Sequence, residues 1–300
     1  MSAPPTFGLV VPQGGAGEIA GPSSLWDVVD AADALEPGSG VGHLWVSDHL
    51  LWWRPMYEAL TLLAAIAART SRVEIGTAVL LLALRPPLLA AKMLASIDRL
   101  AGGRLTVGVG IGGEYAPEWE ASGVERRGRG RRTDEMIRTL RRLWGDDPVG
   151  LQPKPHRPPP IWIGGRSDAA LRRAGRLGDG WMGLFTTPDR YATQLGVVRE
   201  AAARAGRDPA RLVPSLYAWT CIRDSAAEAR ADAAALLPAF YQVPFEKLER
   251  YVVMGTPDAC AEAFARFADA GVAHFAVAPV AAEVSPELVH RLAAVAALVR

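Results

Sequence analysis

Short apolar runs alternate with helical patterns along almost the whole chain. Runs rich in Val, Ile, Leu and aromatic residues are each followed by a segment with a helical period. The strands predicted in this way are residues 7–11, 43–47, 73–79, 105–109, 160–163, 181–185, 213–222 and 274–278. The alternation is typical of parallel strands joined by crossover helices, and eight strands are the number that a closed (β/α)8 TIM barrel of the α/β class requires.

The segments between these strands carry helix signals. The stretch 25–35 places its leucines and valines on one stripe and its three aspartates off it, which predicts a helix that covers the barrel. A hydroxyl residue followed by proline occurs at Thr187, Thr256 and Ser285. Because the hydroxyl can cap free amides and the proline presets φ, these pairs predict three further helix starts.

Two stretches of the chain are longer than a barrel needs. Consecutive strands begin about 30 residues apart, the length of one βα unit, except across 110–160 and 222–274. The excess predicts insertions after the fourth and the seventh strand, which are candidates for lids. Neither stretch has the composition of a long disordered linker, so we expect a single barrel domain over residues 1–300.

Composition and charge exclude several classes of protein. Half of the 300 residues are apolar and 22% are charged, which supports a sizeable core and excludes disordered, collagen-like and coiled-coil chains. The 33 Lys and Arg residues nearly balance the 32 Asp and Glu residues, giving a net charge of +1. We therefore expect no nucleic-acid partner and no membrane association driven by bulk charge.

The cysteines and the N-terminus bear on localisation. Cys221 and Cys260 are the only cysteines and lack a CxxC spacing, so we expect two packed thiols in a reducing compartment. The first residues lack a basic region followed by an apolar one, and no apolar run approaches the roughly 20 residues of a membrane span. We expect a cytoplasmic protein.

The end of the second predicted strand carries the first candidate chemistry. Asp48 and His49 are followed by Trp52 and Trp53. In barrels the reacting groups lie just past the carboxyl ends of the strands, so an imidazole within an aromatic wall could transfer protons there. The alternative is a loop histidine that is merely hydrogen bonded. We expect no metal site, because neither His43 nor His49 has partners at zinc-binding spacing.

The fourth predicted strand runs into glycines. Gly108, Gly110 and Gly113 match GxGxxG formally. A dinucleotide fingerprint opens the first βαβ unit and runs into a helix, whereas this one follows three βα units, so we do not expect NAD. Glycines such as Gly112 and Gly113 would instead let a flat ring approach the backbone, with Glu114 beside it.

Two further segments are candidates for binding an anion. After the fifth strand, Gly164, Gly165, Arg166 and Ser167 precede a helix start and could cradle a phosphate; the alternative is an ordinary turn with Ser167 as N-cap. The basic cluster at 126–132 lacks interleaved aromatic residues for stacking bases and leads into a helix, which favours an anionic cofactor tail over nucleic acid.

Taken in order, the motifs resemble those of the luciferase-like oxidoreductases, specifically the branch that uses the deazaflavin coenzyme F420. The matching segments are FGL at 7–9, LWVSDHL at 44–50, TSRVEIGTAV at 70–79, LASIDRLAGGR at 94–104, PIWIGG at 160–165 and GDGW at 178–181. Each segment is short, but the ordered set spans nearly the whole chain.

The resemblance implies a (β/α)8 barrel with the isoalloxazine-like ring in its mouth, and a non-proline cis peptide at Ala78-Val79 behind the ring. It implies His49, Trp53 and Glu114 as catalytic residues. The cofactor-binding residues that it implies are Asp48, Thr77, Ala78, Val79, Gly112, Gly113, Gly164, Gly165, Arg166 and Ser167. Relatives commonly form dimers, so we expect a homodimer.

These assignments predict hydride transfer between F420 and a small organic substrate, with His49 as acid and base, Glu114 managing a proton near the ring and Trp53 walling the pocket. The chain has only three lysines, which weighs against a phosphosugar substrate and favours a less polar one. The residues that could line its site are Trp52, Trp53, Phe240, Tyr241 and Phe245, the last three of which could instead pack a helix. The alternatives are an FMN-dependent monooxygenase and a cofactorless binding protein on the same barrel.

Overall fold

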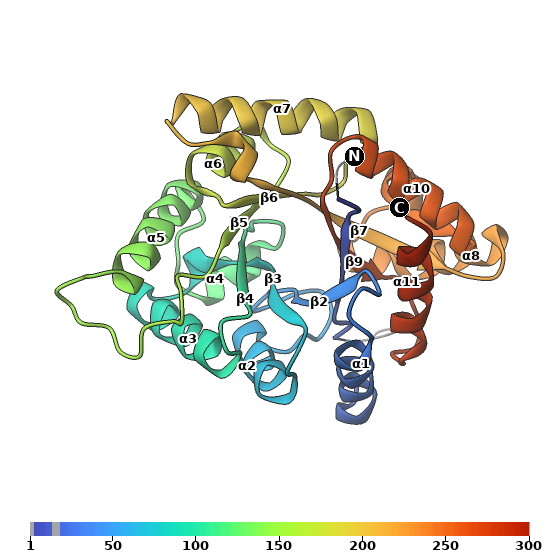
Figure 1. The fold of residues 1–300 in the computed structure, drawn as a ribbon, viewed down its shortest axis with the longest axis horizontal. Helices are drawn as coiled ribbons and strands as arrows, with labels where there is room; N and C mark the ends of the chain where they lie inside the picture. Colours follow the sequence, from blue (N-terminus) through green and yellow to red (C-terminus); the bar gives the residue numbers. More distant parts are fainter. Residues whose placement is uncertain (1–2, 14–18, 300) are drawn as a thin grey trace.

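Parallel strands form a closed barrel in the computed structural model, which describes residues 3–13 and 19–299 (Figure 1). Going round the barrel, the strands are β1 (Thr6–Val10), β2 (Val41–Val46), β3 (Glu74–Leu80), β4 (Leu105–Val109), β5 (Ile161–Gly164), β6 (Gly180–Gly183), β7 (Val213–Ile222) and β9 (His274–Pro279). Pairing of β6 with β7 and of β9 with β1 closes the ring. The predicted strands and the predicted barrel are confirmed.

Helices cover the outside of this barrel (Figure 1). They are α1 (Pro22–Ala34), α2 (Ala59–Arg69), α3 (Pro87–Leu100), α5 (Arg129–Trp144), α6 (Asp168–Leu177), α7 (Pro188–Arg204), α10 (Pro257–Asp269) and α11 (Glu287–Leu298). The stripe predicted in 25–35 is the buried face of α1. Thr187 and Thr256 are the N-caps of α7 and α10, whereas α11 is capped by Pro286, one residue later than predicted.

The insertions after the fourth and seventh barrel strands are also present. The first contains the short helix α4 (Ala116–Ala121), and the second contains α8 (Ala226–Leu236), α9 (Pro238–Tyr241) and the strand β8 (Val253–Gly255). β8 pairs with the end of β7, outside the closed ring, and was not predicted. Three residues are too few to show an alternating pattern.

Large aromatic side chains fill the lower part of the barrel. Trp45 on β2 and Trp162 on β5 lie 5.2 Å apart between ring centroids, and His274 on β9 contacts both. A Cβ atom on Gly8 or on Gly76 would lie 2.4 Å from the Trp45 indole, so these two glycines make room for it. These packed rings therefore fill part of the barrel interior.

Some expectations concern the chain as a whole. Cys221 and Cys260 are buried and unpaired, and burial raises the pKa of the Cys260 thiol to about 12. Within 3–13 and 19–299, no helix is long and apolar enough to cross a membrane. In the same residues, no three His, Cys, Asp or Glu side chains are grouped so that they could hold a metal ion.

Candidate active site

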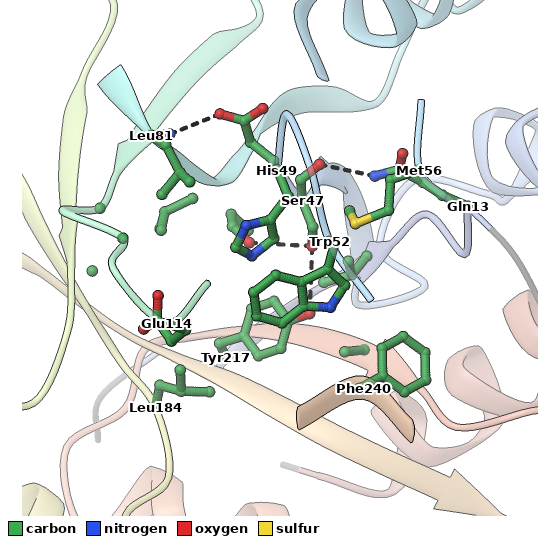
Figure 2. A pocket seen from close by; sticks show the side chains of 18 of the residues that line it. Gln13, Ser47, His49, Trp52, Met56, Leu81, Glu114, Leu184, Tyr217 and Phe240 are labelled. Atoms are coloured by element: carbon green, nitrogen blue, oxygen red, sulfur yellow. Dashed lines mark hydrogen bonds between the residues drawn. The ribbon is translucent and has the colours of Figure 1, made fainter. Parts of the chain in front are cut away.

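A cavity of about 250 Å³ lies at the carboxyl ends of the barrel strands (Figure 2). Its wall comes from the ends of β1, β3, β4, β5, β6, β7 and β9, from the loop after β2 and from α9. Most of the lining is apolar or aromatic, with few polar groups. Such a cavity suits a largely apolar ligand oriented by a small number of polar contacts.

Hydrogen bonds fix the start of the loop after β2. The Ser47 hydroxyl donates to the carbonyl oxygen of Ala78 at 3.3 Å and lies 3.4 Å from the Tyr217 hydroxyl on β7, while the Gln13 amide donates to the Ser47 carbonyl at 2.8 Å (Figure 2). Burial raises the pKa of Tyr217 to about 12, so this hydroxyl stays protonated at neutral pH. The floor of the cavity is thus held by neutral polar groups.

Asp48 forms an ion pair inside the protein. Its two oxygens accept from the Arg85 guanidinium at 2.7 and 2.8 Å, and one of them also accepts the Leu81 amide at 2.8 Å. Arg85 in turn donates to Glu58 at 2.6 Å. Asp48 lines the cavity, but these bonds join the β2 loop to the end of β3. Its predicted contact with the cofactor ring stays a prediction.

His49 is held by a carboxylate that the sequence did not single out. Its Nδ1 lies 3.3 Å from both oxygens of Glu118 on α4, and Glu118 is almost fully buried. Glu118 also accepts the Leu50 amide at 2.6 Å. A carboxylate at this position favours the imidazole tautomer with its proton on Nδ1, which leaves Nε2 as an acceptor. Within the described residues, Nε2 has no hydrogen-bond partner.

Trp52 forms the aromatic wall beside His49. The two rings stack with centroids 3.7 Å apart and planes 20° apart. Trp53, the predicted catalytic tryptophan, is 39% exposed and packs edge-on behind Trp52 and against Tyr115. Trp53 is not among the residues that line the cavity, so its catalytic role stays a prediction. Trp52 does line the cavity.

The opposite wall contains the bulge of β3. Ala78 and Val79 both line the cavity and are joined by a non-proline cis peptide, as the resemblance implied. The pairing of β3 with β4 shifts register between Thr77 and Leu80. Thr77 itself is buried in the sheet, where its hydroxyl donates to the Gly108 carbonyl at 2.8 Å, and it does not line the cavity.

Glycine backbone continues this wall. Gly112, Gly164 and Gly165 line the cavity, and Gly112 and Gly165 have φ values of +54° and +126° that side-chain residues rarely adopt. Gly113 is adjacent but packs against the Arg129 guanidinium instead. Glu114 lines the cavity near Leu184, on the side away from Phe240 (Figure 2). The wall is open to a flat ring, with one carboxylate beside it.

The predicted phosphate loop lies at the edge of the cavity. The Ser167 hydroxyl caps α6 by accepting the Ala170 amide at 3.3 Å, and the Arg166 guanidinium lies 5.4 Å from the centre of the Phe185 ring. Neither Arg166 nor Ser167 lines the cavity, whereas Gly165 does. The N-cap alternative is therefore present, and phosphate binding by this loop stays a prediction.

The remaining aromatic candidates divide between the cavity and the core. Phe240 and Tyr241 line the cavity, and Tyr241 accepts the Trp219 indole N–H at 3.0 Å. Phe245 is buried among core residues outside the lining, so it packs the insertion. The functional residues that sequence reasoning missed are Gln13, Arg54, Glu118, Tyr217 and Trp219. For Tyr217 and Trp219 the period of two along the seventh strand was an available signal.

The sequence pattern of the luciferase-like monooxygenase family matches residues 6–250. An uncharacterised protein of Mycobacterium tuberculosis is 38% identical over 167 residues, which is 51% of this chain and 57% of that protein, so the chain spans little more than half the length of this relative. An F420-dependent glucose-6-phosphate dehydrogenase of Kineococcus radiotolerans is 28% identical over 277 residues, 78% of this chain and 82% of that one.

A solved structure supports the fold. An F420-dependent secondary alcohol dehydrogenase, in complex with an F420-acetone adduct, superposes with a TM-score of 0.84 and 20% identity over 99% of this chain and 100% of that chain. The barrel, the cavity at the carboxyl ends of its strands and the match of the family's sequence pattern to most of the chain all indicate the same family. The chain belongs to the luciferase-like monooxygenase family.

Proposed function

We propose that this protein is a coenzyme F420-dependent oxidoreductase that transfers hydride between the deazaflavin and a small organic substrate. The observation that carries the proposal is that His49, which is paired with Glu118, lines one cavity together with glycine backbone and the Ala78-Val79 bulge. The names of the Kineococcus relative and of the secondary alcohol dehydrogenase support the choice of F420.

The residues present fit such a cofactor. A planar ring needs a wall without long side chains, and Gly112, Gly164 and Gly165 add none to the lining, although a Cβ on Gly164 or Gly112 would meet Val79 or Leu81 and not open space. The first amides of α6 have no acceptor within the helix, so together with Arg166 and Ser167 they would hold a phosphate. When bound, the deazaflavin supplies a hydride at a ring carbon and reacts poorly with oxygen.

Proton handling would come from the chain itself. His49 lines the cavity, and its Nε2, which has no hydrogen-bond partner among the described residues, would accept the substrate hydroxyl proton during oxidation and return it during reduction. Glu118 would stabilise the protonated imidazole and fix its orientation. Glu114 would manage a proton near the ring, and Trp52 would exclude water from His49.

The alternatives are an FMN-dependent monooxygenase, which the family's name favours, and a binding protein without a cofactor. Titrating the purified chain with F420 and with FMN separates the three. We expect quenching of F420 fluorescence with a Kd at least about tenfold lower than that for FMN. Tighter FMN binding would favour the monooxygenase, and no binding of either would reject the enzyme.

We also propose that residues 1–300 act as one barrel domain in the cytoplasm and as a homodimer. Leu88, Leu89 and Leu100 are more than half exposed on α3, which gives this helix an apolar surface that a second copy could cover. Light scattering after size-exclusion chromatography should give twice the monomer mass. In Leu88→Glu the monomer should predominate.

A further inference from the structure

Arg54 is a cation in the cavity wall with a terminal nitrogen, Nη2, that has no hydrogen-bond partner in the part of the chain that the structure describes. It lies in the loop after β2, lines the cavity, and holds its guanidinium carbon 4.4 Å from the centre of the Phe240 ring. One of its terminal nitrogens, Nη2, is fully buried, and within 3–13 and 19–299 this nitrogen has no hydrogen-bond acceptor. Burial lowers the pKa of Arg54, as expected for a cation that no carboxylate compensates.

Every other arginine that the structure describes as buried or half-buried has a partner. Each of them donates to a carboxylate, a carbonyl or a hydroxyl oxygen. They are Arg85, Arg104, Arg129, Arg132, Arg141, Arg173, Arg207, Arg223 and Arg291. Arg54 thus departs from the way this chain satisfies its guanidinium groups, and it does so in the candidate active site.

Among the residues that the structure describes, the carboxylates near the cavity do not supply the missing partner. Asp48 is occupied by Arg85, and Glu118 by His49 and the Leu50 amide. Glu114 lies near Leu184, away from the Phe240 ring over which Arg54 is placed (Figure 2). Burying a guanidinium nitrogen without a hydrogen-bond acceptor costs free energy. A ligand that supplies an acceptor would remove this cost and therefore bind more tightly.

The surroundings of Arg54 indicate which acceptor. Phe240, Met56 and Trp52 line the same cavity, so the body of the ligand lies against apolar and aromatic groups. Within the described residues of the cavity lining, Arg54 is the only lysine or arginine, which suits the single charge of a carboxylate better than the higher charge of a phosphate. We propose that the substrate of this enzyme is an apolar molecule bearing a carboxylate, and that Arg54 binds that carboxylate.

This proposal rests on the proposed function for the identity of the cavity as the active site. It refines the expected weakly polar substrate by adding one anionic end. F420 itself carries carboxylates, so the same chemistry could come from the cofactor. Because Arg54 lies over the Phe240 ring, and Phe240 lies on the other side of the cavity from Glu114 (Figure 2), we assign the carboxylate to the substrate.

The test compares matched ligands on the F420-loaded protein. Isothermal titration would measure 4-phenylbutanoate against 4-phenylbutanamide, and octanoate against octanamide. We expect each carboxylate to bind at least about tenfold more tightly than its amide. In Arg54→Met this ratio should fall to about two or less, whereas Arg138→Met, on the exposed face of α5, should keep it. If Arg54→Met does not fold, Arg54→Gln takes its place.

Several outcomes would overturn the proposal. The first is a preference for the carboxylate over the amide that survives in Arg54→Met. The second is equal binding of acid and amide by the wild type. The third is no binding of the carboxylates at a concentration of about 10 mM. Loss of F420 affinity by about tenfold in Arg54→Met would assign Arg54 to the cofactor instead. If the wild type fails to bind F420, the proposed function fails, and the same ligand pairs on the cofactor-free chain still decide the role of Arg54.

Discussion

Glu118 lies on α4, outside the cavity lining, yet its carboxylate contacts His49 Nδ1 and the amides of Leu50 and Leu51. Glutamine at this position keeps an oxygen that accepts the amides but removes the negative charge that pairs with the imidazole. We expect Glu118→Gln to lower kcat by about 10- to 100-fold in any turnover that the wild type supports, with the Kd for F420 within about threefold.

The same helix offers a matched control for this prediction. Glu120 is exposed two residues along α4, and Glu120→Gln should leave kcat unchanged. Glu118→Ala should also lower the free energy of unfolding by about 2 kcal/mol in urea denaturation, since buried donors lose their acceptor. Equal kcat values for Glu118→Gln and Glu120→Gln would show that Glu118 does not position His49.

The family resemblance and the geometry of the site point to different members of a pair of adjacent tryptophans. The resemblance implies Trp53 as the catalytic tryptophan, whereas Trp52 stacks on His49 and lines the cavity. We expect Trp52→Leu to lower kcat/KM by about tenfold or more, and Trp53→Leu by about threefold or less. The reverse order of effects would assign catalysis to Trp53 and require the loop to rearrange when ligands bind.

At the scale of elements, strands were the most predictable part of the fold. Each barrel strand buries its side chains on both faces and so appears as a short apolar run, whereas β8 has three residues and no pattern. The helix starts at Thr187 and Thr256 are where the sequence predicts them, although only the Thr256 hydroxyl accepts a helix amide, and the start of α11 moved by one residue. The sequence therefore predicted which strands and helices exist better than it predicted the residues at which they begin and end.

The site was predicted only in part, for a physical reason. His49 and Glu114 lie in the loops that follow β2 and β4, so their place at the barrel mouth follows from the fold. Glu118 reaches His49 because α4 packs against the β2 loop, and Asp48 meets Arg85 from the end of β3. Such contacts between separate segments leave no periodic signal in the sequence, so the structure was needed to find them.

The contact between Asp48 and Arg85 joins the β2 loop to the segment after β3. Both Asp48 oxygens are paired, and the Asp48 side chain is fully buried. We expect Arg85→Met to lower the free energy of unfolding by about 3 to 5 kcal/mol, because it leaves a buried carboxylate without its cation. Arg138→Met should change it by about 0.5 kcal/mol or less, as for other exposed sites.

A second replacement separates charge from packing in this contact. Removing both charges in Asp48→Asn, Arg85→Met should restore part of the stability lost in Arg85→Met alone, because no buried anion then remains unpaired. Urea denaturation of the wild type, of the single variants Asp48→Asn and Arg85→Met, and of the double variant gives the coupling energy between the two side chains. A double variant as unstable as the sum of the single variants would mean that the two side chains act independently.

At the scale of the whole molecule, the barrel encloses two histidines among its large aromatic side chains. The Trp45 indole donates to His274 Nε2 at 3.0 Å, and the His43 and His274 rings lie 4.5 Å apart. Burial lowers the pKa of His43 to about 4 and that of His274 well below its usual value. Both side chains are therefore neutral in the folded protein at neutral pH.

This pair makes stability depend on pH in a definite direction. The unfolded chain binds protons at these histidines below about pH 6.5, whereas folded His43 does so only near pH 4, so stability is full above 6.5 and is lost as the pH falls. For His43 alone the loss between pH 7 and pH 5 is about 2 kcal/mol, and His274 adds a loss of the same sign. Urea denaturation at both pH values measures the sum.

His43→Leu tests the assignment, because within residues 3–13 and 19–299 the buried His43 Nδ1 has no hydrogen-bond partner to lose. We expect stability at pH 7 to change by about 1 kcal/mol or less and the loss between pH 7 and pH 5 to shrink by about 2 kcal/mol. His290→Gln, exposed on α11, should leave the pH dependence as in the wild type. If His43→Leu keeps the full loss on acidification, the acid sensitivity arises from groups outside the barrel interior.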